Sequence, residues 1–325
     1  FDLQNGPLIS VEIWQLPEAK TSVLITVHHI VVDGWSLGLL TRNLGMIYGK
    51  IATNEWNDLW KENHSFSVFL KEQHANINSK SKQDILAYWQ NEFSNFQPSE
   101  ILPSDFKRPN IKTYNTDCHR IKLSSEAFAQ LKKGAAKMGT TPYFLLLAAF
   151  QSLVFRLSNQ PETVIGIVAA GQNIGDNQSV VGHLANMLPV RIRANGESTF
   201  EAHLKLVRGK LLDAFDHQNF TFGSLVKSLP VQRSAQHNPL VSVVFNMDSP
   251  LENLDFGNEV TATTIPVQKQ YDNFDCFLNI KPVGDQLMIE WFYNTDLFKA
   301  TTIQHRLETY RSVLFHLLEN EEQQL

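Results

Sequence analysis

The chain has 325 residues, of which 43% are hydrophobic, and its 28 basic and 33 acidic side chains give a formal net charge of −5. This length favours two domains, and the apolar content is sufficient for two buried cores. Because the sequence holds no long basic run, it lacks the electrostatic footprint of a nucleic-acid-binding protein, and small molecules or other proteins are the expected partners.

The first part of the chain predicts a β-hairpin followed by helices. Residues 8–14 and 22–27 are rich in β-branched side chains and alternate in polarity, and a turn at residues 17–20 joins them. Apolar residues then recur at helical spacing. The helices predicted from this spacing follow Gly34 and cover residues 66–76 and 82–93.

Residues 98–115 contain three prolines and few periodic apolar residues. This composition predicts a linker between an N-terminal lobe at residues 1–112 and a C-terminal lobe at residues 113–325. The second lobe also mixes strands and helices. Its predicted elements are strands at 118–123, 163–168, 240–247, 274–282 and 286–293, a loop at 169–178, and helices at 125–138, from 142 onward, at 200–215 and at 300–319.

This mixture of hairpin-like strand pairs and helices predicts an α/β chain made of two-layer α+β lobes, in which helices cover one side of each sheet. The sequence contains no G-x-G-x-x-G, P-loop or G-x-S-x-G pattern, so the usual signals of dinucleotide-binding proteins and esterases are missing.

No secretory or membrane segment is evident, and a cytoplasmic location is expected. The most apolar stretch, residues 142–155, is interrupted by Gln151 and Ser152 and is too short to span a bilayer, so it is predicted as a buried core helix. Cys118 and Cys276 are far apart and lack metal-binding spacing, so both are expected to be reduced. The chain begins without methionine and soon enters a strand, so we expect it to be cut from a longer protein.

The sharpest local feature is residues 27–36, with the sequence VHHIVVDGWS. His28 and His29 end the predicted strand, and Asp33 and Gly34 follow after three apolar residues. Adjacent side chains on a strand point to opposite faces, so one histidine should face a cleft while the other packs inside. Asp33 would lie on the turn that follows and stabilise the loop. Gly34 would permit a close backbone approach before the helix.

Three interpretations of these residues compete. The histidines are a structural pair at a strand end, or metal ligands, or one of them is a catalytic imidazole that handles the amine or hydroxyl of an acyl acceptor. A metal site needs further ligands at suitable spacing, and none is nearby in the sequence. The residues alone leave the choice open.

The run His28-His29-x-x-x-Asp33-Gly34 resembles the HHxxxDG motif of nonribosomal peptide synthetase condensation domains. Related acyltransferases share HxxxD, so the ordered series of later signatures is the stronger indication. These signatures are FDL and GPL within residues 1–8, HSFSVF at 64–69 (a degraded YxDFAxW), GHLANMLPVR at 182–191 (G-x-x-x-N-x-x-x-x-R), HQNFTF at 217–222 (HQDxPFE, with Asn219 replacing the acid and Gly223 the glutamate), residues 233–240 (RDxSRNPL) and YNTDLF at 293–298.

The resemblance implies a chloramphenicol-acetyltransferase-like fold, with two similar lobes meeting in a V around a tunnel. Donor and acceptor peptidyl carrier proteins would deliver acyl and aminoacyl groups on 4′-phosphopantetheine arms, and the acceptor amine would attack the donor thioester directly. Neighbouring synthetase domains are the other implied partners. The domain itself is expected to bind no cofactor, metal, nucleic acid or membrane.

The resemblance also implies roles for single residues. His29 is expected to face the tunnel and to orient the acceptor amine or take its proton, while His28 packs inside. An α-amine has a pKa of about 8, so a useful fraction is already neutral near pH 7, which favours orientation over base strength. Trp35 and Ser36 are candidates for lining the substrate channel.

Asn186 and Arg191 are further channel candidates, and a buried hydrogen-bonding role fits them equally well. His217 is expected to be a helix cap or a packing residue. His183 lies within the 182–191 signature, at a position where the pattern specifies no residue, and receives no role.

In the family, the aspartate corresponding to Asp33 pairs with an arginine from an upstream motif that this sequence lacks. We therefore expect an incomplete first lobe, a loop around His28 and His29 that is less well held than in the whole domain, and a chain that self-associates or needs an upstream segment. Two other functions stay open: a catalytically silent carrier-recruiting module, which the intact HHxxxDG disfavours, and an epimerization or ester-forming relative. Trp35 argues against epimerization.

Overall fold

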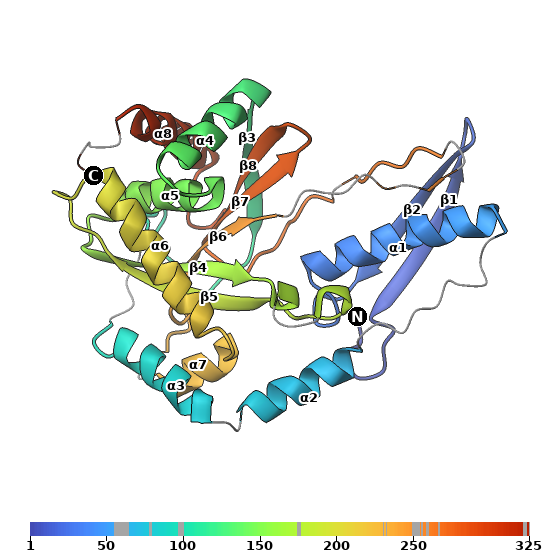
Figure 1. Ribbon diagram of the computed structural model, residues 1–325, viewed down its shortest axis with the longest axis horizontal. Helices are drawn as coiled ribbons and strands as arrows, with labels where there is room; N and C mark the ends of the chain where they lie inside the picture. The colour runs from blue at the N-terminus through green and yellow to red at the C-terminus, as the bar shows by residue number, and fades with distance from the viewer. Residues whose placement is uncertain are drawn as a thin grey trace. The chain divides into compact units, whose positions relative to one another are not determined.

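The computed structural model describes residues 1–54, 65–77, 80–96, 101–173, 177–229, 231, 233–248, 254, 256–257, 260–265, 267–320 and 324 (Figure 1). The chain forms two compact units. Unit 1 comprises Phe1–Ala75, Ala170–Ala185 and Glu252–Ile265, and unit 2 comprises Asn76–Ala169, Asn186–Leu251 and Pro266–Leu325. Both units are discontinuous in sequence, and the predicted lobe boundary at residue 112 stays a prediction.

Unit 1 begins with the predicted hairpin, which is confirmed. Strands β1 (Ile9–Leu16) and β2 (Lys20–Val27) pair antiparallel from Ile9↔Val27 to Leu16↔Lys20. Glu18 and Ala19 form the turn with φ values of 61° and 55°. Two consecutive residues with positive φ match the right-handed twist of the flanking strands. Helices α1 (Gly34–Ala52) and α2 (Phe66–Ile77) follow, as expected from the helical spacing.

The hairpin exposes an unusual amount of apolar surface. All eight residues of β1 are exposed, and Ile13 retains 66% of its accessible surface. The segment 252–265 reaches α1 through the edge-to-face contact of Tyr48 with Phe256, whose ring centroids are 5.6 Å apart. A two-stranded sheet is marginally stable by itself, so this part of unit 1 holds little stability of its own.

Unit 2 is built on a mixed sheet, six-stranded within the described residues, in the order β3-β8-β7-β6-β4-β5. The pairs β4–β6 and β6–β7 are parallel, and the others are antiparallel. The strands are β3 (Thr116–Leu123), β4 (Glu162–Ala169), β5 (Asn186–Arg193), β6 (Val243–Met247), β7 (Cys276–Val283) and β8 (Gln286–Asn294). Strand β6 starts three residues later than predicted, since Leu240 takes a φ of 64° directly after Pro239.

Helix α5 (Pro142–Ser158) is the buried core helix that the sequence predicts. Ten of its residues are buried, and Phe150 lies edge-on to Trp291 with ring centroids 5.5 Å apart. Figure 1 shows α5 between α6 and α8, beside the sheet. The other helices of unit 2 are α3 (Lys80–Glu92), α4 (Ser125–Lys137), α6 (Phe200–Asp216), α7 (Phe222–Ser228) and α8 (Ala300–Glu319).

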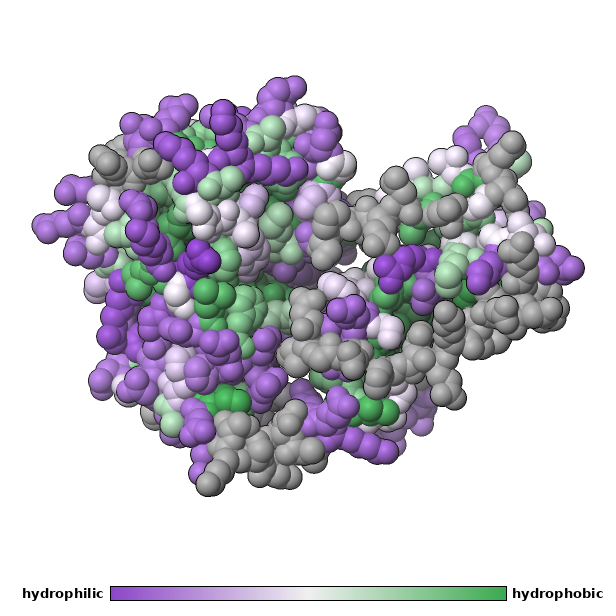
Figure 2. Space-filling view, in the orientation of Figure 1, coloured by the Kyte–Doolittle hydropathy of each residue, from purple (hydrophilic) through white to green (hydrophobic). Residues whose placement is uncertain are grey.

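Unit 2 has a largely hydrophilic surface on the face drawn in Figure 2 and contains both cysteines of the chain. Figure 2 shows hydrophilic residues over much of the drawn face of unit 2. Cys118 and Cys276 are free thiols. In the part of the chain that the structure describes, no single helix is long and apolar enough to cross a membrane, and α4 and α5 pass that test only together, as a pair bent by 94°.

The exposed hairpin generates a prediction about association. We expect residues 1–325, produced alone, to self-associate, because Val11 and Ile13 present a row of apolar side chains on one face of β1. Replacing both by threonine keeps the β propensity and removes apolar area, so it should shift the concentration dependence of the mass measured by light scattering toward the monomer. Ile111→Thr, at an isolated residue that is 74% exposed, is the matched control. Unchanged association in the double variant would contradict the prediction.

Candidate functional site

The two motif histidines lie in a turn and not at the end of a strand, which corrects the sequence expectation. Strand β2 ends at Val27, and a turn follows in which Val31 N donates to His28 O at 3.1 Å. The strand alternation therefore does not set the two side chains. His28 N still donates to Leu8 O at 2.9 Å, so the turn begins directly at the hairpin.

His28 packs locally. Its Nδ1 accepts a hydrogen bond from Ile30 N at 3.1 Å, and its half-buried ring lies edge-on to Phe1, with centroids 5.3 Å apart. The side chain therefore stabilises the turn, and the inward role of His28 stays a prediction.

His29 is exposed and faces a second histidine that the sequence left without a role. Its Nδ1 lies 3.2 Å from Nδ1 of His183, and the ring centroids are 4.9 Å apart at an interplanar angle of 73°. Burial lowers the pKa of His183, and the neighbouring His29 lowers it further. The two residues are separated by 154 positions in the chain, so no local pattern could have paired them.

Asp33 holds the two segments that carry these histidines. It caps the N-terminus of α1, where its Oδ1 accepts from Ser36 N at 2.8 Å. Its Oδ2 accepts from the backbone N–H groups of Leu184 (2.9 Å) and Ala185 (3.1 Å). Gln172 Nε2 donates to both carboxylate oxygens at 3.0 and 2.9 Å. Asp33 is only 4% exposed, so these neutral donors replace its hydration.

The hydrogen bonds decide the charge of Asp33. Burial raises the pKa of its carboxyl, but the bonds from Gln172, Ser36 and Leu184 outweigh burial and hold that pKa below the usual 3.8. The carboxylate is therefore ionised at neutral pH. In this chain amide donors hold Asp33, and the expectation that the loop is less well held than in the whole domain stays a prediction.

Ser36 completes the connection to the backbone of residue 182. Its Oγ donates to Gly182 O at 2.8 Å and accepts from Gly182 N at 3.0 Å, and Asp33 N also donates to Gly182 O at 3.2 Å. Trp35 Nε1 donates to Gln178 O at 3.1 Å. The polar atoms of Trp35 and Ser36 thus bind backbone, and their candidacy as channel-lining residues stays a prediction.

The glycine expectations need a correction. A Cβ on Gly34 would meet nothing within 4 Å, so no close backbone approach requires glycine there. The close approaches occur at Gly171, where a Cβ would lie 2.3 Å from Leu184 O, and at Gly182, where it would lie 2.3 Å from Phe66 Cδ2. Gly171 and the buried Gln172 fall in a segment predicted only as a loop, and its composition gives no signal of their contacts.

Asn186 and Arg191 make the contacts of buried hydrogen-bonding residues within unit 2. Asn186 Nδ2 donates to Gln218 O (3.1 Å) and Phe220 O (2.8 Å), and its Oδ1 accepts from Phe222 N (3.1 Å). It thereby fixes the turn before α7.

Arg191, 4% exposed, pairs with Glu162 at 2.6 Å and lies over the ring of Phe96, 5.2 Å from its centroid. His217 stacks on Tyr88 with ring centroids 3.8 Å apart. These contacts favour the structural alternative for all three motif residues, Asn186, Arg191 and His217. His64 lies outside the described residues.

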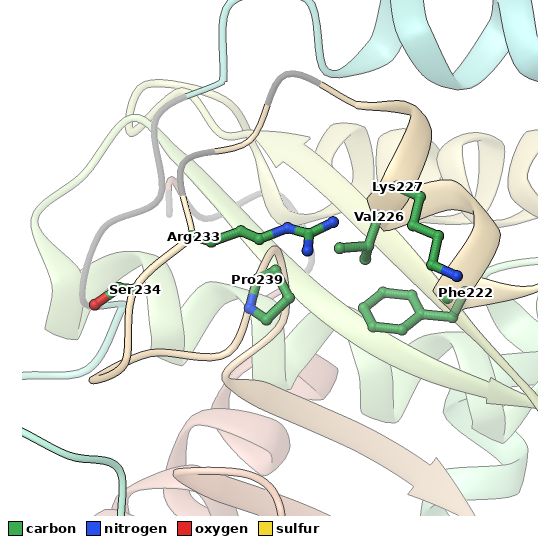
Figure 3. A pocket seen from close by; sticks show the side chains of 7 residues that line it. Phe222, Val226, Lys227, Arg233, Ser234 and Pro239 are labelled. Atoms are coloured by element: carbon green, nitrogen blue, oxygen red, sulfur yellow. The ribbon is translucent and has the colours of Figure 1, made fainter.

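Unit 2 also contains a cavity of about 370 Å³ at the N-terminal end of α7 (Figure 3). Lys227 and Arg233 bring two positive charges to it, and Phe222, Val226 and Pro239 supply apolar surface. Gly223 and Ser234 complete its lining. Among the described residues, no group of three or more His, Cys, Asp or Glu side chains is arranged to hold a metal ion.

Comparisons with known proteins agree with the motif series. A family model described as Condensation domain matches residues 1–325. Gramicidin S synthase 2 from Aneurinibacillus migulanus is 30% identical over 324 residues, which cover 99% of this chain and 7% of that protein. The chain thus spans a small part of the curated relatives that it matches.

Solved structures share the fold. A four-domain nonribosomal peptide synthetase bound to AMP and glycine superposes with a TM-score of 0.86 at 21% identity, over 100% of this chain and 25% of that one. The first condensation domain of the calcium-dependent antibiotic synthetase gives a TM-score of 0.81 at 16% identity, over 98% of this chain and 68% of that one. The predicted chloramphenicol-acetyltransferase-like α/β fold is confirmed.

The hydrogen bonding of Asp33 generates a stability prediction. Asp33→Asn keeps the shape but places an NH₂ group against N–H donors, so we expect it to lower the free energy of unfolding at pH 7 by about 3 kcal/mol. The pKa of Asp33 is lower in the folded state, so its stabilising contribution is present above pH 3.8 and is lost as the pH falls through the folded pKa. The difference between wild type and variant should therefore shrink on acidification, as measured by urea unfolding.

Glu72→Gln, at an exposed residue of α2, is the control and should change stability by no more than about 0.5 kcal/mol. A difference between wild type and Asp33→Asn that persists unchanged to pH 2 would show that the carboxylate charge is not the source of the stability.

Proposed function

The chain belongs to the condensation-domain family, and from this premise we propose that it forms an amide bond between an acyl or peptidyl thioester donor and an aminoacyl acceptor, each carried on the phosphopantetheine arm of a carrier protein. The observation that carries the proposal is the intact HHxxxDG run. In this run His29 is exposed, and Asp33 is buried with hydrogen bonds to both carboxylate oxygens.

The reaction makes modest chemical demands. The acceptor amine attacks the thioester carbonyl, a C–N bond forms, the C–S bond breaks, and the proton that the amine loses balances the one that the leaving thiolate gains. An α-amine has a pKa of about 8, so the nucleophile is already partly neutral near pH 7. Positioning the amine next to the thioester carbonyl therefore contributes more to the rate than a strong base would.

His29 is the residue that we assign to the amine. Its ring is exposed, and its Nδ1 is engaged with His183, which leaves Nε2 for a substrate. A neutral Nε2 accepts a hydrogen bond from the amine N–H, which turns the nitrogen lone pair toward the thioester and favours loss of the proton. Asp33 contributes indirectly, because it binds the backbone of the segment that follows His29 and of the segment that carries His183.

The cavity beside α7 supports a place for the phosphopantetheine arm. A phosphate carries negative charge that Lys227 and Arg233 attract, while Phe222 and Val226 suit the apolar part of the arm. Gly223 stands where the family pattern has glutamate, and that replacement removes a carboxylate from the cavity and makes it more cationic. We propose this cavity as the site of the phosphate on one of the two arms.

The alternative functions differ in what they need from His29. A silent carrier-recruiting module needs no exposed imidazole, and an epimerization relative is disfavoured by Trp35. An ester-forming relative would have to deprotonate a hydroxyl, whose pKa is far above that of an amine, so positioning alone would not serve it. The histidine pair fits amide formation better.

The two motif histidines should respond differently to alanine. We expect His29→Ala, tested in the full-length protein with loaded donor and acceptor carriers, to lower product formation at least about 100-fold without changing the unfolding midpoint, because its ring contributes little packing. His28→Ala should lower the free energy of unfolding by about 1–2 kcal/mol, since the ring contact with Phe1 and the bond from Ile30 N are lost. Intact-protein mass spectrometry reads the product.

His305→Ala, at an exposed residue of α8, is the control and should change neither quantity. Loss of product at His28 with no loss at His29 would reverse the assignment. Full activity in both variants would contradict the role assigned to His29, and a wild type that forms no product would contradict the proposed function.

The cavity makes a separate prediction. Free 4′-phosphopantetheine should bind more tightly than pantetheine without the phosphate, and Lys227→Gln with Arg233→Gln should remove that preference. Each exposed ion pair is worth about 0.2–1 kcal/mol, so we expect a preference of about fivefold in titration calorimetry. Lys122→Gln with Lys133→Gln, at two exposed residues of unit 2, is the charge-matched control. Equal affinity for both ligands in the wild type would remove the cavity from the proposal.

A further inference from the structure

We propose that His183 is a positioning residue for His29: through the Nδ1···Nδ1 hydrogen bond it keeps the proton of the neutral His29 ring on Nδ1 and leaves Nε2 as an acceptor for the substrate amine. The direction of this hydrogen bond rests on the proposed function. Neither the motif series nor the family resemblance gives His183 a role.

The first step is the geometry of the pair. Two imidazole nitrogens 3.2 Å apart form a hydrogen bond only when one carries a proton and the other does not. If His183 donates, the neutral His29 ring must carry its proton on Nε2. If His29 donates, its Nε2 is bare. The tautomer of His29 is therefore set by its neighbour.

The second step is the demand of the nucleophile. An amine attacks through its lone pair, so an Nε2–H group that donates to this lone pair would block the attack. A bare Nε2 instead accepts from one amine N–H and leaves the lone pair free. Only the arrangement in which His29 donates to His183 serves amide formation.

The third step is how the fold holds His183. Its two chain neighbours are both fastened to the N-terminal turn of α1: Gly182 exchanges hydrogen bonds with Ser36 Oγ, and Leu184 N donates to Asp33. Gly182 also lies against Phe66, since a Cβ there would be 2.3 Å from the phenylalanine ring. The backbone of residue 183 is thus fixed relative to the turn that presents His29.

The surroundings of His183 favour its neutral form. Desolvation lowers the pKa of its ring and the neighbouring His29 lowers it further, and together they outweigh Asp33 and the backbone groups of His29 and Val32, which raise it. A neutral imidazole carries its proton on one nitrogen, so a neutral His183 with its proton on Nε2 presents a bare Nδ1 to His29.

The direct test is spectroscopic and needs no activity. In protein labelled with ¹⁵N-histidine, long-range ¹H–¹⁵N spectra above pH 8 report which nitrogen of His29 is protonated, and His29→Gln identifies its signals. We expect an Nδ1–H tautomer in the wild type. His183→Phe keeps a ring of similar shape without the acceptor, and should shift His29 to the Nε2–H tautomer or to a mixture. His183→Asn places an amide oxygen near the former Nδ1 and should retain Nδ1–H.

The kinetic arm separates positioning from packing. His183→Phe should lower kcat about tenfold while KM and the unfolding midpoint stay within about twofold and 2 °C, and His183→Asn should recover most of kcat. His305→Phe is the control. An Nε2–H tautomer of His29 in the wild type, or an unchanged tautomer and kcat in His183→Phe, would overturn the inference. A wild type that forms no amide would refute the proposed function alone, because the tautomer spectra decide independently of activity which ring donates and whether His183 controls His29.

Discussion

A single buried carboxylate, that of Asp33, connects the parts of unit 1 on which the candidate site depends. Its charge would be costly in a site that is 4% exposed unless hydrogen bonds replaced water. Backbone groups of Ser36, Leu184 and Ala185 and the amide of Gln172 supply those bonds. Three of these donors lie 139 or more residues away in the sequence, so one side chain ties the hairpin and α1 to the segment that carries His183.

This arrangement explains how two histidine side chains from distant segments of unit 1 come into contact. Asp33 aligns two backbone segments, and their alignment brings the Nδ1 atoms of His29 and His183 to 3.2 Å. A carboxylate hydrogen-bonded directly to His29 would stabilise an imidazolium, whereas a second imidazole is itself uncharged and disfavours a second positive charge nearby. A neutral, oriented imidazole suits an amine whose pKa is close to the ambient pH. Such an amine is already partly deprotonated, so the reaction depends more on the orientation of the amine than on the basicity of the imidazole.

The sequence predicted what depends on local pattern and missed what depends on distant contacts. The hairpin, the buried helix α5 and the later strands follow from polarity periods of two and 3.6 residues, and they agree with the structure to within a few residues. The strand ends before the histidines and not at them, because His28 forms a turn in which its carbonyl accepts from Val31 N and its Nδ1 accepts from Ile30 N. Gln172 and His183 lie in segments without periodicity, and only the folded chain brings them to Asp33 and His29.

The motif residues fall into two groups: those whose polar atoms bind other parts of the fold, and those whose polar atoms remain accessible. Asp33, Ser36 and Asn186 bind backbone groups, and the Gln172 side chain also donates to Asp33 and Ser36. Arg191 directs its guanidinium to Glu162 and the Glu92 carbonyl. Residues of this kind fix loops, and a substitution there changes activity only by moving something else. His29, whose ring remains exposed, and the cations beside α7 are the groups that can still meet a substrate. Specificity in this chain is therefore best sought at the histidine pair and the cationic cavity, because Asp33, Ser36, Asn186 and Arg191 are already engaged in contacts within the fold.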